Sequence, residues 1–188
     1  TGAVQSRLGQ MLCKYSGISG GATVRLPNAN VVGAKPWDEP AAMTVEGDGT
    51  VVTVAAKSDG TQSLRVGETG GSGIVNVKGG ILRGAPDNRT FMFRLGIAEG
   101  DTGTLNVSGG TVDVGSGGYA QLTIGMSGDA TVNLSGGEIV SGKAVNFGYG
   151  AAMKSVRRSV LNQTGGTLRA SGDGVTLNDY GNTANRES

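Results

Sequence analysis

A short glycine-centred motif recurs along the chain and limits how the chain can fold. In its clearest copy, residues 100–115, Leu105 and Val107 alternate with polar residues before a Gly109-Gly110 pair, and the alternation then resumes as far as Val114. Alternating apolar and polar residues predict a strand with one buried face, and paired glycines between two such runs predict a tight bend. Each copy is therefore expected to form two short strands that meet at a glycine corner.

The motif repeats with a nearly constant period. Its asparagine recurs at spacings of 30, 27 and 29 residues, as Asn76, Asn106, Asn133 and Asn162. A further short run that ends in glycine precedes each copy, at residues 64–67, 94–96, 122–125 and 145–148. Three strands per repeat with this period are typical of a parallel β-solenoid, in which coils stack about 4.8 Å apart and align like residues in columns.

The sequence therefore predicts an all-β fold, a parallel β-helix of about five coils of 27–30 residues, with the right-handed coiling usual for such crossovers. The solenoid is expected to span residues 16–178 and to be followed by a polar tail, residues 179–188. Residues 1–15 carry apolar side chains at helical spacing instead, and we expect a short amphipathic helix there, as a cap or an assembly element. Its apolar residues are Val4, Leu8, Met11, Leu12 and Tyr15.

The composition excludes several classes of protein. The 36 glycines fit corners rather than collagen, because no Gly-x-y period is present. The formal net charge is +1 with the charges dispersed, so we expect no basic surface for nucleic acid, and no apolar run is long enough to span a bilayer. We interpret the single cysteine, Cys13, as a buried small hydrophobe, with intermolecular pairing or metal binding as alternatives. The chain begins with Thr1 without a recognisable signal peptide, so we expect a processed or excised piece.

The sequence contains no histidine, which removes Ser-His-Asp and Cys-His catalysis and histidine metal sites. We therefore predict no enzymatic activity, no catalytic residues and no cofactor. Calcium is the metal that remains to be considered, because hard oxygen ligands can converge in glycine-containing turns. Four aspartates lie in such turns, namely Asp48, Asp59, Asp101 and Asp129. Aspartate in a turn usually accepts hydrogen bonds from its own backbone, so we interpret them as turn caps and predict no metal site.

Several residues are candidates for stacking or binding. By strict alternation the motif asparagines point outward, and we expect them to form a hydrogen-bonded ladder that stabilises coil stacking rather than a row of ligand contacts. This ladder consists of Asn76, Asn106, Asn133 and Asn162. Gln163 falls in a core column, where its amide needs a partner. Trp37 lies in a proline-rich loop, either as a ligand contact or folded over the edge of the solenoid.

The repeats, Leu-x-Ile-Gly followed by Gly-x-Gly-Thr-Leu-Asn-Val-Ser-Gly-Gly-Thr-Val, resemble the glycine-rich β-strand repeats of autotransporter passengers and PEP-CTERM-associated surface proteins. The resemblance covers about residues 64–172 and is best in residues 95–115 and 122–137. It implies a secreted or cell-surface β-solenoid of bacterial origin. It implies no catalytic residues, because the motif is architectural.

These inferences predict a non-enzymatic structural β-solenoid of the bacterial cell surface or extracellular space. We expect it to assemble end to end into a filament or to serve as an adhesin segment or scaffold, because the ends of a solenoid expose unpaired strands. The expected partners are further copies of the chain, and a polysaccharide or a host surface is the other partner considered. The candidate interface residues are Val4, Leu8, Met11, Leu12, Tyr15, Val175 and Leu177.

The alternative function is that of a polysaccharide-binding or polysaccharide-lyase β-helix. Such a protein needs a charged cluster along one groove of the solenoid to hold an acidic sugar. The candidate clusters are Asp87 with Arg89, and Lys143 with Arg157 and Arg158.

Overall fold

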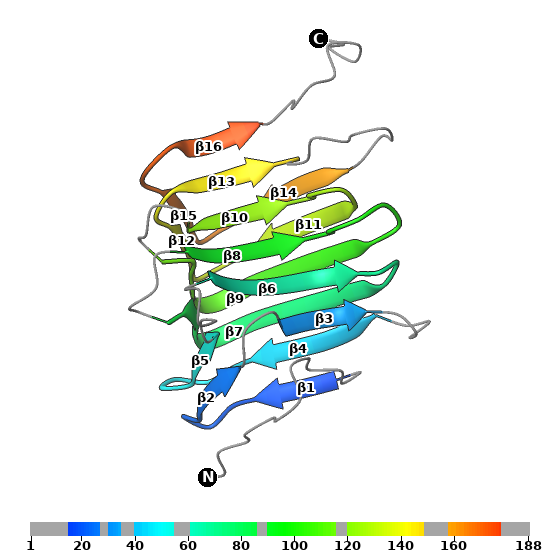
Figure 1. The fold of residues 1–188 in the computed structure, drawn as a ribbon. Coiled ribbons are helices and arrows are strands. Elements are labelled where there is room, and N and C mark those ends of the chain that lie inside the picture. Colours follow the sequence, from blue (N-terminus) through cyan, green and yellow to red (C-terminus); the bar gives the residue numbers. More distant parts are fainter. Residues whose placement is uncertain are drawn as a thin grey trace, which may run out of the picture.

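The computed structural model describes residues 15–26, 30–34, 40–54, 61–85, 90–115, 120–148 and 158–177. These residues form sixteen strands and contain no helix, and all of their strand pairs are parallel. Successive coils lie one above the other (Figure 1). The predicted all-β parallel solenoid is thus confirmed. The predicted helix, apart from Tyr15 at the start of the first strand, and the predicted tail lie outside the described residues.

Each coil contributes three strand segments, and these segments line up in three ladders. The first ladder contains β1 (Tyr15–Ile18), β4 (Ala41–Val45), the first halves of β7 (Ser72–Gly84) and β9 (Thr102–Asp113), β11 (Asp129–Leu134) and β14 (Ser159–Gln163). The second ladder contains β2 (Thr23–Leu26), β5 (Val51–Val54), the second halves of β7 and β9, β12 (Glu138–Ser141) and β15 (Thr167–Ala170). The third ladder contains β3 (Asn30–Ala34), β6 (Thr61–Glu68), β8 (Thr90–Leu95), β10 (Gln121–Ile124), β13 (Ala144–Phe147) and β16 (Gly174–Leu177).

The third ladder has six rungs, whereas the sequence predicted about five coils. The difference comes from residues 15–34, which form a complete first coil although they lack the asparagine motif. Parallel pairing with β4, β5 and β6 places β1, β2 and β3 in the same register as the later coils. The first coil therefore has the register of the later coils without carrying their asparagine motif.

The core is a column of inward-facing aliphatic side chains inside the three ladders. In β9, Leu105, Val107 and Val112 are fully buried and alternate with more exposed polar residues. Leu105 is in register with Val75 of the coil before and Val132 of the coil after. Fully burying one such side chain contributes roughly 1.5–3 kcal/mol. Because the rungs are in register, each of these residues packs on a like residue of the next coil.

The corner between the first and second ladders requires glycine for two reasons. The second glycine of each pair adopts the left-handed region, with φ of 70° at Gly110 and Gly137, which side-chain-bearing residues rarely adopt. A Cβ atom added at Gly137 would also lie 2.5 Å from the carbonyl oxygen of Gly110, one coil away. The corner thus needs glycine both for its backbone conformation and for the close approach of two coils.

We expect Gly137→Ala to lower the free energy of unfolding by roughly 3 kcal/mol, from left-handed alanine and from steric displacement together. Gly100→Ala is the matched control, because Gly100 has φ of 83° but an added Cβ would meet nothing within 4 Å. That variant should lose only about 1–2 kcal/mol. Denaturant unfolding followed by circular dichroism measures both losses, and equal losses would contradict the proposed role of the close approach.

Candidate functional site

The outward face of the first ladder carries the motif asparagines. Asn76, Asn106, Asn133 and Asn162 are in register on successive rungs. In each step the Nδ2 atom donates a hydrogen bond to the Oδ1 atom of the preceding asparagine, at 2.8 Å in all three steps. Asn76 continues the series by donating to Thr44 Oγ1 at 3.3 Å. The structure therefore contains the stacking ladder that the spacing of the motif predicted.

This ladder leaves part of each amide directed away from the stack. An asparagine side chain offers two N–H donors and one carbonyl oxygen with two lone pairs, and Asn106 uses one donor and one lone pair within the ladder. On either side of it run uncharged polar residues, among them Thr104 with Thr131 and Ser108. The asparagine side chains therefore mainly form hydrogen bonds between coils, and the face around them is polar and mostly uncharged.

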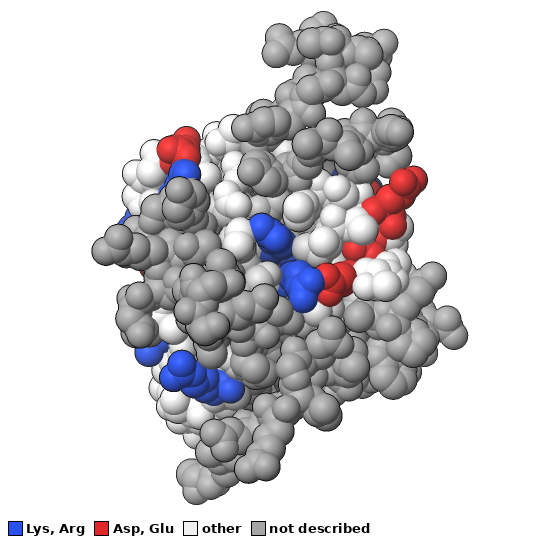
Figure 2. All heavy atoms as spheres, viewed as in Figure 1, with Lys and Arg blue, Asp and Glu red and all other residues white. Residues whose placement is uncertain are grey.

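Charged side chains lie in small groups, as Figure 2 shows for one side of the molecule. Arg169 Nη2 lies 3.0 Å from Glu138 Oε1, and Lys143 Nζ lies 3.7 Å from Asp173 Oδ2, so both pairs join neighbouring coils of the solenoid. Exposed pairs of this kind contribute about 0–1 kcal/mol each. Lys143, a residue of one predicted polysaccharide cluster, is therefore engaged by a carboxylate in this structure.

The other members of the predicted polysaccharide clusters are not brought together by the described part of the chain. Arg158 is exposed, and its backbone N–H donates to Asp129 Oδ1 at 3.0 Å. Asp87, Arg89 and Arg157 lie outside the described residues. The polysaccharide groove stays a prediction.

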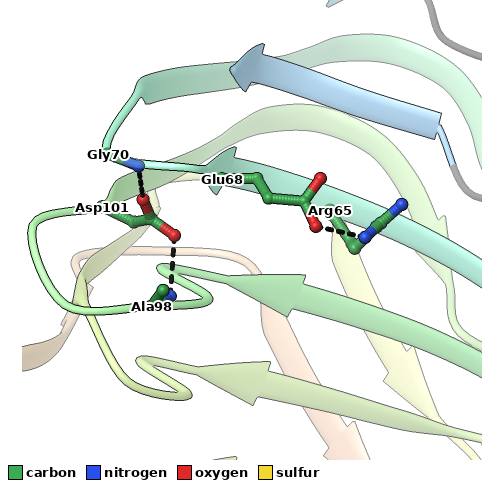
Figure 3. Close-up of polar contacts among 5 residues, drawn as sticks. All are labelled: Arg65, Glu68, Gly70, Ala98 and Asp101. Carbon is green, nitrogen blue, oxygen red and sulfur yellow. Dashed lines mark hydrogen bonds and ion pairs between the residues drawn. The ribbon is translucent and has the colours of Figure 1, made fainter. Parts of the chain in front are cut away.

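Asp101 lies in the turn between β8 and β9 and connects two coils (Figure 3). Its side chain is buried, Oδ2 accepts the Ala98 N–H at 2.7 Å, and Oδ1 accepts the N–H of Gly70, which belongs to the turn one coil earlier. Asp129 makes a similar connection to Arg158 of the following coil. These two aspartates therefore cap backbone groups, and two of the caps reach across to another coil.

No group of three or more His, Cys, Asp or Glu side chains that could hold a metal ion occurs among the described residues. Asp48 lies in an exposed turn, and Asp59 lies outside the described part of the chain. The donors around Asp101 are backbone N–H groups, which compete with a cation for the carboxylate oxygens. The arrangement at Asp101 is that of a structural cap.

Arg65 also appears in Figure 3, where its guanidinium contacts the carboxylate of Glu68, three residues along β6. Arg65 is in register with Arg94 of β8, on the outward side of the third ladder. The sequence alone did not predict this pair. Each arginine lies two residues before a glycine of the aligned short runs, Gly67 and Gly96, but this spacing alone does not fix the register of the two strands.

The two ends of the described solenoid differ. At the first coil Ile18, Val24 and Leu26 are buried. At the last coil the inward-facing Val175 is 53% exposed. Gln163, which the sequence placed in a core column, is exposed there and donates from Nε2 to the Gly166 carbonyl at 3.2 Å, which supplies a partner for its amide.

The remaining predicted interface residues divide into two groups. Tyr15 lies in β1 and Leu177 in β16, at opposite ends of the described solenoid. The others lie outside the described residues, and these are Val4, Leu8, Met11 and Leu12, together with the predicted ligand contact Trp37.

The fold and its ladders define the class of this protein as a parallel β-solenoid of three strands per coil. No family model, curated protein or solved structure matches the chain. In the described part of the chain there is no helix with the length and apolar character needed to cross a membrane.

Asn106→Val should lower the free energy of unfolding by roughly 1–3 kcal/mol, because it removes two hydrogen bonds while valine keeps a high strand propensity. Asn162→Val is the matched control, because Asn162 is exposed and makes one bond in the ladder. Asn162→Val should lower the free energy of unfolding by about half as much as Asn106→Val. Denaturant unfolding of both variants tests the ladder, and a loss at Asn162 as large as that at Asn106 would argue against it.

Asp101→Ala should lower the free energy of unfolding by roughly 3 kcal/mol or more, because two backbone N–H groups lose a charged acceptor. Asp101→Asn should cost less, since its amide oxygen still accepts one of the two bonds. The control is Asp48→Ala in an exposed turn, which should stay within about 0.5 kcal/mol of the unchanged protein. Thermal unfolding measures both losses of stability. Equal losses in Asp101→Ala and Asp48→Ala would contradict the role of Asp101 in connecting two coils.

Proposed function

We propose that this chain is a non-enzymatic structural β-solenoid that associates end to end with further copies of itself, as part of a filament or scaffold at the bacterial cell surface or outside the cell. The observation that carries the proposal is the exposed apolar end of the solenoid at Val175. The surface setting is supported by the resemblance of the repeats to those of exported surface proteins.

The inward column of the third ladder ends at β16 with an exposed side chain. Leu122 and Val145 are fully buried, whereas Val175, which is in register with Val145, is 53% exposed. Among the residues whose side-chain burial the structure describes, it is the one large apolar residue that is exposed. Covering it with another rung would contribute roughly 1 kcal/mol, about half the value for a fully buried valine. Leu161 and Leu168 of the same coil are only partly buried and would add to this.

The strand edges of the last coil also favour association with a second copy of this chain. Among the described strands, β14, β15 and β16 each pair on one side only. Their free sides carry backbone groups spaced for another parallel or antiparallel strand. A second copy of this chain offers coils with the same three-strand outline. A contact between unlike ends propagates into a fibre, whereas a contact between two C-terminal ends closes as a dimer.

The proposal is tested with Val175→Asp, which places a charge at the exposed end of the inward column. Sedimentation velocity of the unchanged chain at rising concentration should show larger species, and electron microscopy should show rods longer than one solenoid. Val175→Asp should raise the concentration required for association by about tenfold or more, because burying an unpaired carboxylate is costly.

The matched control is Thr176→Asp, which adds the same charge to the same strand at the neighbouring outward position, in register with Asn146. Thr176→Asp should associate nearly as well as the unchanged chain. A chain that remains monomeric at every concentration, or equal effects of the two substitutions, would overturn the proposal. Fibres would identify contacts between unlike ends, and two-solenoid rods would identify contacts between like ends.

A further inference from the structure

Two arginines with a threonine between them form one outward column on the second ladder. Arg25 of β2 is in register with Thr53 of β5, and Thr53 is in register with Arg83 of β7. The arginine Cα atoms are therefore two rungs apart, about 9–10 Å. Arg25 is exposed, and it makes no hydrogen bond or ion pair with the residues that the structure describes. Its guanidinium group is thus open to a ligand.

The side chain of Arg83 extends along this column toward Arg25. Its Nε atom donates a hydrogen bond to Thr53 Oγ1 at 3.4 Å, although Asp113 of β9 lies opposite Arg83 on the other side. Asp113 Oδ1 instead accepts the backbone N–H of Gly115 at 2.8 Å, and no ion pair joins Arg83 to Asp113 in the described structure. Arg83 is therefore directed toward a second positive charge and away from the carboxylate of the next coil.

The positions beside this column on the same face are uncharged. Thr23, Val51 and Ile81 are in register with one another, two residues before Arg25, Thr53 and Arg83 on the same three strands, so all six point outward. Val51 and Ile81 are partly exposed and present aliphatic surface next to the arginine column. Figure 2 shows basic atoms without adjacent acidic atoms at the lower left of the molecule, where Figure 1 shows β2 and β5.

We propose that Arg25 and Arg83 form a binding site for an oxyanion, namely a sulfate or carboxylate group. The planar guanidinium group presents paired N–H donors that match the oxygens of such a group, and two converging arginines can hold it from two sides. Thr53 is a positioning residue, because its hydroxyl holds Arg83 in the direction of Arg25. The aliphatic surface of Val51 and Ile81 suits the carbon skeleton of an acidic polysaccharide, and a free ion is the other source of the oxyanion.

This site is separate from the end proposed for association, because it lies on a lateral face over the first three coils. The experiment measures binding of the full chain to dextran sulfate, to uncharged dextran and to inorganic sulfate by titration calorimetry at low ionic strength. We expect binding to dextran sulfate and none to uncharged dextran. Arg25→Gln should weaken binding by about tenfold, the effect of losing one charge-assisted contact.

A second variant, Thr53→Val, tests the geometry of the site without changing its charge. Valine has nearly the shape of threonine and a high strand propensity, but it cannot accept the hydrogen bond from Arg83 Nε. Thr53→Val should therefore weaken binding severalfold. A general attraction of dextran sulfate to positive charge would leave binding by this variant unchanged.

The matched control is Arg158→Gln, which removes the same charge from another exposed arginine, at the start of the last described segment. Arg158→Gln should bind dextran sulfate as the unchanged chain does. Absence of binding to both sulfate probes, equal weakening by Arg158→Gln and Arg25→Gln, or unchanged binding by Thr53→Val would each overturn the proposal. If Thr53→Val fails to fold by circular dichroism, Arg25→Lys replaces it. Arg25→Lys keeps the charge but loses the planar fork, so it should bind more weakly than the unchanged chain.

The two sulfate probes identify the source of the oxyanion. Much tighter binding of dextran sulfate than of inorganic sulfate, compared at equal concentrations of sulfate groups, assigns the site to an acidic polysaccharide. Equal binding per sulfate group assigns it to a free ion. Sedimentation of the same variants keeps the two proposals apart, because Val175→Asp should lose association and keep anion binding, whereas Arg25→Gln should do the reverse.

Discussion

The rest of this structure depends on parallel, in-register pairing between successive coils. Pairing at about 4.8 Å brings each residue directly onto its counterpart one coil away, so the choice of residue at one position restricts the choice along the whole column. The glycine corners show this restriction at its strongest, because the space for a side chain at Gly137 is occupied by the backbone of Gly110. The same restriction recurs at Gly110 and Gly166, where an added Cβ would also meet the backbone of the preceding coil. The repeat of glycines in the sequence thus follows from contact in space.

In-register stacking of like residues stabilises some side chains and destabilises others. Stacked aliphatic residues exclude water, and stacked amides such as those of Asn106 and Asn133 satisfy one another at 2.8 Å. Stacked charges of one sign repel, and elsewhere in the described ladders basic residues alternate with neutral or acidic ones, as Arg83 does with Asp113. Arg65 and Arg94 are the exception, and the carboxylate of Glu68 contacts the Arg65 guanidinium beside them.

The sequence predicted the features that follow from local pattern and period. Alternation identified the strands, and the paired glycines identified the corners. The motif asparagines could be placed outward and in one column, because one repeat of 27–30 residues is one coil. Residues 15–34 were predicted to belong to the solenoid, but they lack the motif, so they were not counted as a separate coil. The connection from Asp101 to Gly70 could not be derived, because it depends on how turns of variable length approach each other across 31 residues.

The arginine pair shows a different limit of prediction from sequence. Both residues occur in the aligned short runs, but their register requires the exact pairing of β6 with β8, and a shift of one residue would move either side chain to the other face. The register of the ladder asparagines could be predicted because four copies of the motif fix their alignment. Two arginines alone do not fix an alignment, so the structure was needed to bring them together.

The constraint that builds the solenoid also distinguishes its last described coil from the coils in the middle. A coil in the middle has both of its strand edges and its inward column covered by neighbours, whereas the last described coil has a neighbour on one side only. Polar ladders and dispersed charges keep the lateral faces hydrated, as the outward asparagines of the first ladder illustrate. The apolar surface and the strand edges therefore coincide at the C-terminal end of the described chain. A coil is stabilised mainly by the coil next to it, and this is the physical reason for proposing another coil of the same kind as the partner of this end.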